Sequence, residues 1–213
     1  MIKITNKSEA LNIIEPSYLA SLSALLWIAL YYLPVGGALL RLILPLPLIL
    51  LHIRRGSKVA LDGIIIQLLL LVILMGPIRG PLFLFPYGLL AFWLGWCWSK
   101  SKSWWFSWIL GVIIGAIGFA IRVFALSTLV GENLWIIITR ASYSLIDKFS
   151  EFLNISSSPS LLSIQIVAIL LIIFQEIVYV FTIHIIAYSL FPRFKSRVPD
   201  PPLILDDFVK FKL

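Results

Sequence analysis

Cysteine is nearly absent from this sequence, so the fold cannot rely on disulfide bonds. The single cysteine, Cys97, has no second cysteine to pair with in the chain. It stands among tryptophan and phenylalanine residues, a setting typical of a small side chain that packs in an apolar interior. We therefore interpret Cys97 as a packing residue and not as a reactive thiol.

Charge is also scarce, and this scarcity defines the class of protein. Of the 213 residues only 13% are charged and 61% are hydrophobic, which leaves too few polar side chains to cover a water-soluble globule. Runs such as 64–75 and 166–174 are apolar on every helical face, whereas the strands of a membrane barrel alternate in polarity. Because backbone groups in lipid must be hydrogen-bonded internally, we expect these runs to be helices. The sequence predicts an all-α, polytopic membrane protein.

Catalytic and cofactor signatures are lacking as well. The sequence contains no phosphate-binding loop, dinucleotide fingerprint, zinc-protease motif or serine-hydrolase motif. His52 and His184 stand near span ends without Cys, Asp or Glu at metal-ligand spacing, which predicts interfacial side chains and no metal site. A single embedded carboxylate provides no acid and base pair. We therefore expect neither an enzyme nor a cofactor.

Proline, glycine and polar segments divide the apolar sequence into six expected spans. These spans are 17–33, 38–52, 59–75, 82–98, 104–130 and 160–191. The second is expected to be irregular because it contains Pro45 and Pro47. Residues 1–16 then form a cytoplasmic N-terminal segment, and residues 192–213 form a cytoplasmic tail. A secretory signal peptide is the competing interpretation of the first run, but its small residues precede most of the apolar stretch, which favours an uncleaved span.

Basic residues indicate how the chain is oriented. Lysine and arginine close to spans are retained on the cytoplasmic side of a membrane. Of the 17 basic residues, twelve fall on the side of the two termini, three on the opposite side and two inside spans. The net charge of +7 is thus spread over short connections and forms no patch for nucleic acid. We expect a multi-pass protein of the plasma (inner) membrane, or of an equivalent energy-transducing membrane, with both termini cytoplasmic.

The segment 132–153 has the pattern of an amphipathic helix. Apolar residues recur there at steps of three and four residues, with charged residues between them. Such a helix lies along a membrane interface and buries its apolar face in lipid. We expect one interfacial helix in addition to the six spans.

Small residues form a stripe along the fifth span. Gly111, Gly115 and Gly118 follow one another at helical steps, where the lack of a side chain lets another backbone approach closely. Arg122 continues the same stripe. We therefore expect the glycines to serve helix packing, and Arg122 to face protein and not lipid.

Ionisable side chains inside spans are costly in hydrocarbon, so they usually face a partner or a cavity. Arg41, Arg122 and Glu176 are the examples here, and their distances from the span ends place them at one depth in the outer third of the bundle. Gln175 and Tyr179 are expected to join them. Two interpretations fit this cluster. It binds a small anionic ligand, or it is a structural ion pair with one arginine that reaches the lipid headgroups.

Motifs in the first sixty residues resemble those of a known family. The Leu-Pro-x-Gly-Gly turn at 33–37, the Leu-Pro-Leu-Pro segment at 44–47 and the Ile-Arg-Arg-Gly loop at 53–56 resemble the YybS-like family of uncharacterised membrane proteins, domain of unknown function 2232. That family is similar to the S components of energy-coupling-factor vitamin transporters. The resemblance implies an S-component-like bundle with an outward-facing ligand cavity.

The same resemblance implies a partner protein. In S components an Ala-x-x-x-Ala pattern on the first helix packs against a coupling membrane subunit, and Ala20 and Ala24 have that spacing here. Small residues at this spacing also serve ordinary helix packing. The leading interpretation is a small-molecule-binding transport subunit that depends on partners for energy. The alternative is a structural or assembly subunit of a larger membrane complex, with 132–153 and 203–213 as docking surfaces.

Overall fold

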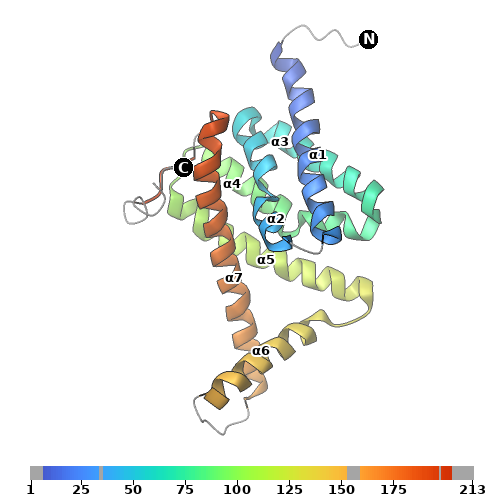
Figure 1. Ribbon diagram of the computed structural model, residues 1–213, viewed down its shortest axis with the longest axis vertical. Coiled ribbons are helices and arrows are strands. Elements are labelled where there is room, and N and C mark those ends of the chain that lie inside the picture. Colours follow the sequence, from blue (N-terminus) through green and yellow to red (C-terminus); the bar gives the residue numbers. More distant parts are fainter. Residues whose placement is uncertain (1–6, 34–35, 153–158, 197, 203–213) are drawn as a thin grey trace.

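The protein is a bundle of helices, and no strand occurs in the residues that the structure describes (Figure 1). This computed structural model describes residues 7–33, 36–152, 159–196 and 198–202, so the expected docking tail at 203–213 lies outside them. The helices are α1 (Lys7–Tyr32), α2 (Gly37–Ile43), α3 (Leu46–Arg79), α4 (Leu89–Ser99), α5 (Trp104–Val130), α6 (Leu134–Phe152) and α7 (Leu161–Leu190). Short turns of helix are η1 (Pro81–Phe83), η2 (Leu84–Gly88) and η3 (Phe191–Phe194). The all-α prediction is confirmed.

Helix α3 folds back on itself at Gly56 and is not straight. Gly56 has φ 83° and ψ 178°, a conformation that side-chain-bearing residues rarely adopt. A Cβ at Gly63 would contact the side chains of Leu51 and Leu48. In a straight helix residues 51 and 63 would lie about 18 Å apart, at 1.5 Å per residue. The two arms of α3 are therefore packed against each other.

This fold-back accounts for the number of membrane spans. Five described stretches are long and apolar enough to cross a membrane: Ala10–Tyr32, Leu39–Arg79, Pro81–Ser99, Trp104–Val130 and Leu161–Phe194. The second stretch has 41 residues and contains the reversal at Gly56, so its two arms raise the number of helices that could cross a membrane from five to six. Its first arm is interrupted at Pro45, between α2 and α3, where an irregular span is expected.

The core and the surface are both apolar, as a membrane protein requires. Large side chains such as Trp27, Phe83 and Ile183 are fully buried at the centre of the bundle. Others on the outward helical faces are exposed, among them Ile73, Phe124 and Leu170. Because an apolar surface of this extent is unfavourable in water, the outward faces suit lipid.

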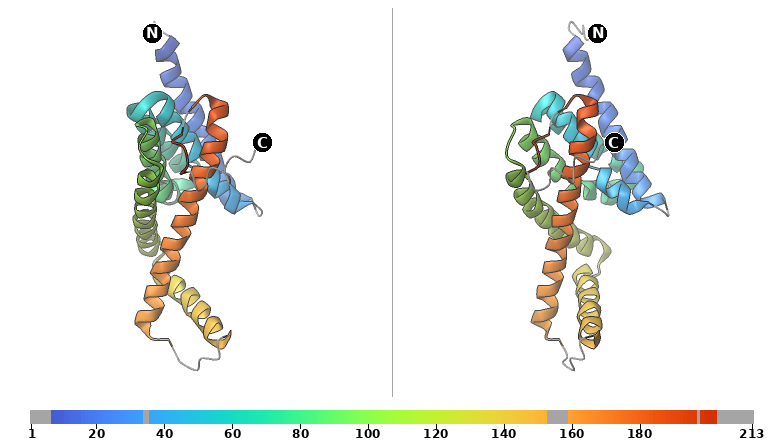
Figure 2. Two further views of the ribbon diagram at one scale, coloured as in Figure 1. Left: turned by 90° about the vertical axis from the view of Figure 1, so that its left-hand side faces the viewer. Right: turned by 60° about the vertical axis from the view of Figure 1, so that its left-hand side comes forward.

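The molecule has two distinct ends. Figure 1 shows the start of α1 and the end of α7 toward one end, and α6 at the other. In both views of Figure 2, α6 and the first half of α7 form an arm that projects away from the remaining helices. The helix predicted at 132–153 is present as α6, and one of its faces packs on α7 and α5.

At the end of the molecule where α1 starts and α7 ends, contacts bring together connecting segments that carry basic residues. Glu15 forms ion pairs with Arg54, at 3.1 Å, and with Arg55, at 2.6 Å. The turn between α4 and α5, which includes Lys102, lines one groove with residues that follow α7, including Asp200. The start of α1, the Gly56 reversal, the α4–α5 turn and residues 198–202 thus share one end, which we name the basic end.

Candidate ligand cavity

A cavity of about 380 Å³ lies between α2, η2, α5, α6 and α7. Its volume is within the range of small-molecule sites, about 300–1,000 Å³. The five polar residues expected to form a cluster all line it: Arg41, Arg122, Gln175, Glu176 and Tyr179. The other lining residues are Pro86, Tyr87, Phe119, Val123, Leu126, Leu134, Ile137 and Ile138. The cavity is thus mainly apolar, with a few convergent polar groups.

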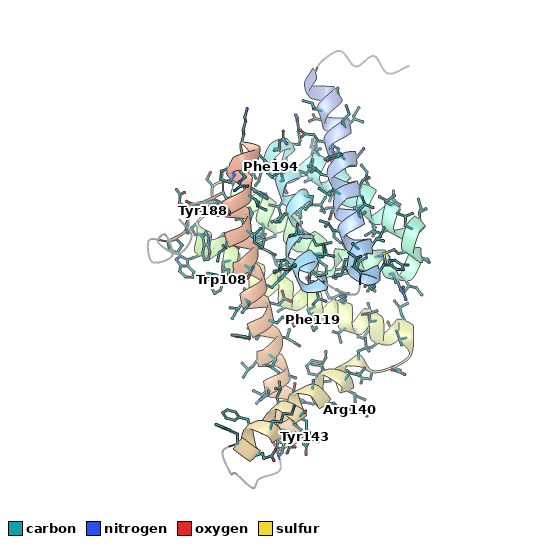
Figure 3. The ribbon with its side chains drawn as sticks, viewed as in Figure 1. Trp108, Phe119, Arg140, Tyr143, Tyr188 and Phe194 are labelled. Atoms are coloured by element: carbon teal, nitrogen blue, oxygen red, sulfur yellow. The ribbon has the colours of Figure 1, made fainter. Side chains whose placement is uncertain are left out.

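The cavity lies where the bundle meets the projecting arm. Figure 3 places Phe119 on α5 at this junction, with Arg140 and Tyr143 further along the arm on α6. Tyr188 and Phe194 lie toward the opposite, basic end. The α6 residues Leu134, Ile137 and Ile138 therefore form the side of the cavity that belongs to the arm.

Arg122 is surrounded by aromatic side chains. Its guanidinium carbon lies 5.3 Å from the centre of the Trp27 ring and 5.7 Å from that of the Tyr87 ring, both cation–π distances. Its Nη2 donates a hydrogen bond to the Tyr31 hydroxyl at 3.3 Å. Sequence analysis did not assign Trp27 and Tyr31 to this site, although their spacing of four residues places them on one face of α1.

Glu176 is 2% exposed and projects from α7 toward α5. Its Oε2 atom has no hydrogen-bond partner among the described residues. A Cβ at Gly115 would collide with this carboxyl group, so the glycine provides the space that the carboxyl occupies. Likewise a Cβ at Gly111 would meet Val180 of α7. Gly111 and Gly115 therefore bring α5 close to α7, whereas a Cβ at Gly118 would collide with Pro86 of η2.

The structural-ion-pair interpretation lacks the contact that it requires. Ion pairs in the described part of the chain join Glu15 with Arg54 and Arg55, at the basic end. Glu176 is within ion-pair distance of neither Arg41 nor Arg122. The three ionisable side chains line one cavity without neutralising one another.

Of the remaining polar residues, Tyr179 is buried, whereas Arg41 and Gln175 lie nearer the surface. Tyr179 donates a hydrogen bond from its hydroxyl to the backbone oxygen of Arg41 at 3.1 Å, which ties α7 to α2. The Tyr87 and Tyr179 rings meet edge to face at 6.0 Å. The side chains of Arg41 and Gln175 are exposed. These two residues therefore stand at the rim, and Glu176 lies deeper.

Ala20 and Ala24 are both fully buried within the bundle itself. Such close packing is typical of small residues at this spacing. Their burial fits a helix-packing role. A contact between α1 and a coupling subunit would have to be made by exposed neighbours such as Tyr18 and Leu25.

The expectation that His52 and His184 are interfacial is wrong, because both are fully buried. His184 is held by two hydrogen bonds, from its Nδ1 to the Val180 oxygen at 2.8 Å and between its Nε2 and the Ser107 hydroxyl at 2.9 Å. His52 bonds the Ser57 hydroxyl through Nε2 at 3.0 Å. These partners satisfy both nitrogens of His184 and Nε2 of His52, whereas His52 Nδ1 is buried without a hydrogen-bond partner among the described residues.

A comparison with protein families gives one match. The family described as predicted membrane protein (DUF2232) matches residues 21–204. Neither a curated protein nor a solved structure matches the chain. The match extends over all the elements that line the cavity.

Proposed function

Because the chain belongs to the DUF2232 family of predicted membrane proteins, we propose that it holds a small anionic molecule in the cavity between the bundle and the α6–α7 arm. In this proposal it is a substrate-binding subunit, similar to S components of energy-coupling-factor transporters. It has no energy source of its own and depends on a coupling subunit. Its role is binding and not catalysis.

One observation carries the proposal: polar residues remote in sequence line one cavity, and the charged side chains among them form no ion pair with one another. Tyr179 and Arg41, for example, are 138 residues apart and are joined by a hydrogen bond at its edge. Unpaired charges inside a membrane protein are costly, so they usually mark a functional site. Two arginines against one glutamate leave a net positive charge, which favours an anionic group.

We also propose an orientation for this site. The basic end contains Arg54, Arg55 and Lys102, so the positive-inside rule favours placing it in the cytoplasm. The cavity then lies in the outer half of the bundle. An S-component-like subunit captures its substrate from that side.

A structural or assembly role is the second candidate. Several large apolar side chains of α6 are exposed: Leu145 at 50%, Phe149 at 65% and Phe152 at 81%. An exposed apolar face on a projecting arm suits either lipid or a partner protein. In this second proposal the arm docks to a larger membrane complex, and the cavity has no ligand.

Mass spectrometry of gently purified protein, combined with an affinity pulldown, distinguishes the ligand-binding role from the assembly role. The ligand proposal predicts a small molecule that is retained by the unaltered chain and by Arg140→Ala, an exposed arm variant, but not by Arg122→Ala. A stoichiometric large complex with no retained small molecule supports the assembly role. Equal retention by Arg122→Ala and Arg140→Ala contradicts the cavity as the binding site.

A further inference from the structure

We infer that the molecule bound in this cavity carries an acidic group for Arg122, an N–H donor for Glu176 and an apolar body between them. This inference rests on the proposed binding function and specifies its ligand class. The cavity supplies a different chemistry for each part of such a molecule, as the positions of its lining residues indicate.

The acidic group follows from the environment of Arg122. Trp27 and Tyr87 lie at cation–π distance from the guanidinium, and Tyr31 accepts one hydrogen bond from Nη2. A guanidinium has five N–H donors, so others remain for a ligand. Arginine forms paired hydrogen bonds with carboxylate and phosphate groups, which lysine cannot reproduce.

The N–H donor follows from Glu176. This carboxyl group is almost fully buried, lines the cavity and has an oxygen without a hydrogen-bond partner in the described residues. A carboxylate only accepts hydrogen bonds. A purely anionic ligand would leave it unpartnered and would add a second negative charge nearby. An amine or a ring N–H would satisfy it.

A metal ion fits Glu176 less well than an N–H group does. Hard cations in proteins bind several oxygen ligands, usually from more than one carboxylate. Among the residues that the structure describes, no three His, Cys, Asp or Glu side chains are grouped to hold a metal ion. Of the described residues that line the cavity, Glu176 is the only acidic one.

The apolar body follows from the remaining walls. Phe119 on α5, and Ile137 and Ile138 on α6, face the same cavity as the charged groups. Small-molecule sites typically combine such apolar walls with a few polar groups that fix orientation. A compact molecule with the acidic group and the N–H donor but no apolar part would leave these walls uncovered.

The test incubates the purified protein with the small-molecule fraction of a cell extract and sorts the retained compounds by chemical class. We expect the unaltered chain to enrich compounds that carry both an acidic group and an N–H donor. Glu176→Gln should reduce their retention by about tenfold, as expected for one charge-assisted hydrogen bond, and should spare compounds with an acidic group alone. Glu151→Gln, an exposed change of the same kind on α6, should have no effect.

A second variant changes the site without removing a charge. Gly115→Ala adds one methyl group where the Glu176 carboxyl lies, so it should displace the carboxyl and reduce retention of the same compounds. Retention by Glu176→Gln and Gly115→Ala equal to that of the unaltered chain would overturn the inference of an N–H donor at Glu176 and leave the binding function standing. If the unaltered chain enriches nothing beyond Arg122→Ala, the binding function itself is contradicted.

Discussion

At the scale of single residues, Arg122 is stabilised by aromatic rings and not by a carboxylate. Its contacts with Trp27 and Tyr87 lie at 5.3 and 5.7 Å, and a desolvated cation–π contact contributes about 0.5–2 kcal/mol. The rings therefore stabilise the guanidinium inside the bundle. One of its N–H groups bonds Tyr31, and the others can bind a ligand in the proposal above.

Ser107 provides a test of the buried polar contacts. Its hydroxyl lies 2.9 Å from His184 Nε2 and accepts a weak hydrogen bond from Trp98 Nε1 at 3.4 Å. Ser107→Ala leaves both groups buried without this partner, so we expect a loss of about 1–3 kcal/mol in unfolding free energy. Thermal unfolding in detergent measures this loss of stability. The exposed Ser99→Ala should change stability by less than about 0.5 kcal/mol, and equal losses in the two variants would contradict a structural role for Ser107.

At the scale of elements, the reversal inside α3 depends on one backbone conformation. Gly56 has a positive φ, and a Cβ there would meet no atom within 4 Å. Any cost of Gly56→Ala therefore comes from backbone strain, which amounts to about 1–3 kcal/mol. Gly37→Ala is the matched control, because its Cβ would make only an ordinary contact with Leu30, at 3.5 Å.

We expect thermal unfolding in detergent to show Gly56→Ala clearly less stable than Gly37→Ala. The control variant should be neutral or slightly stabilised, since alanine reduces the freedom of the unfolded chain. A Gly56→Ala protein as stable as the Gly37→Ala protein would mean that the chain does not reverse through this conformation.

The element pattern could be predicted largely from the sequence, because a bilayer demands long apolar helices. The spans, the helix at 132–153 and the break at Pro45 follow from local composition. The tightness of the reversal at Gly56 does not follow from local composition. A basic loop is expected at 54–58, but helical geometry continues on both sides of Gly56, because a glycine with positive φ reverses the chain by itself.

Side-chain partners could not be predicted in the same way. Ser107 and His184 are 77 residues apart, and Arg122 and Tyr31 are 91 apart. The sequence around one member of each pair does not indicate where the other member lies. The burial of His184 and the aromatic surroundings of Arg122 therefore depend on tertiary packing. The depth of Arg41, Arg122 and Glu176 could be estimated, because helical rise converts sequence position into height within the membrane.

At the scale of the whole molecule, charged side chains form ion pairs at one end and line the cavity without such pairs toward the other. At the basic end Glu15 is paired with Arg54 and Arg55. At the cavity Arg122 and Glu176 have no such pairing. In the proposals above, the basic end sets the orientation of the chain in the membrane and the cavity binds the ligand.

The central claim is that the cavity lined by Arg122 and Glu176 opens toward the outer side of a six-span bundle. Thiol accessibility in intact cells tests it, starting from Cys97→Ala, which removes the only cysteine. Single cysteines are then introduced at Leu126, which lines the cavity, at Ile117, an exposed position of the same helix outside it, and at Lys100 in the α4–α5 turn.

A charged, membrane-impermeant reagent added outside should label Leu126→Cys and spare Ile117→Cys, because thiols in lipid do not ionise readily. Lys100→Cys should react only after the membrane is permeabilised. Labelling of Lys100→Cys from outside, or no difference between Leu126→Cys and Ile117→Cys, would contradict the outward-facing cavity.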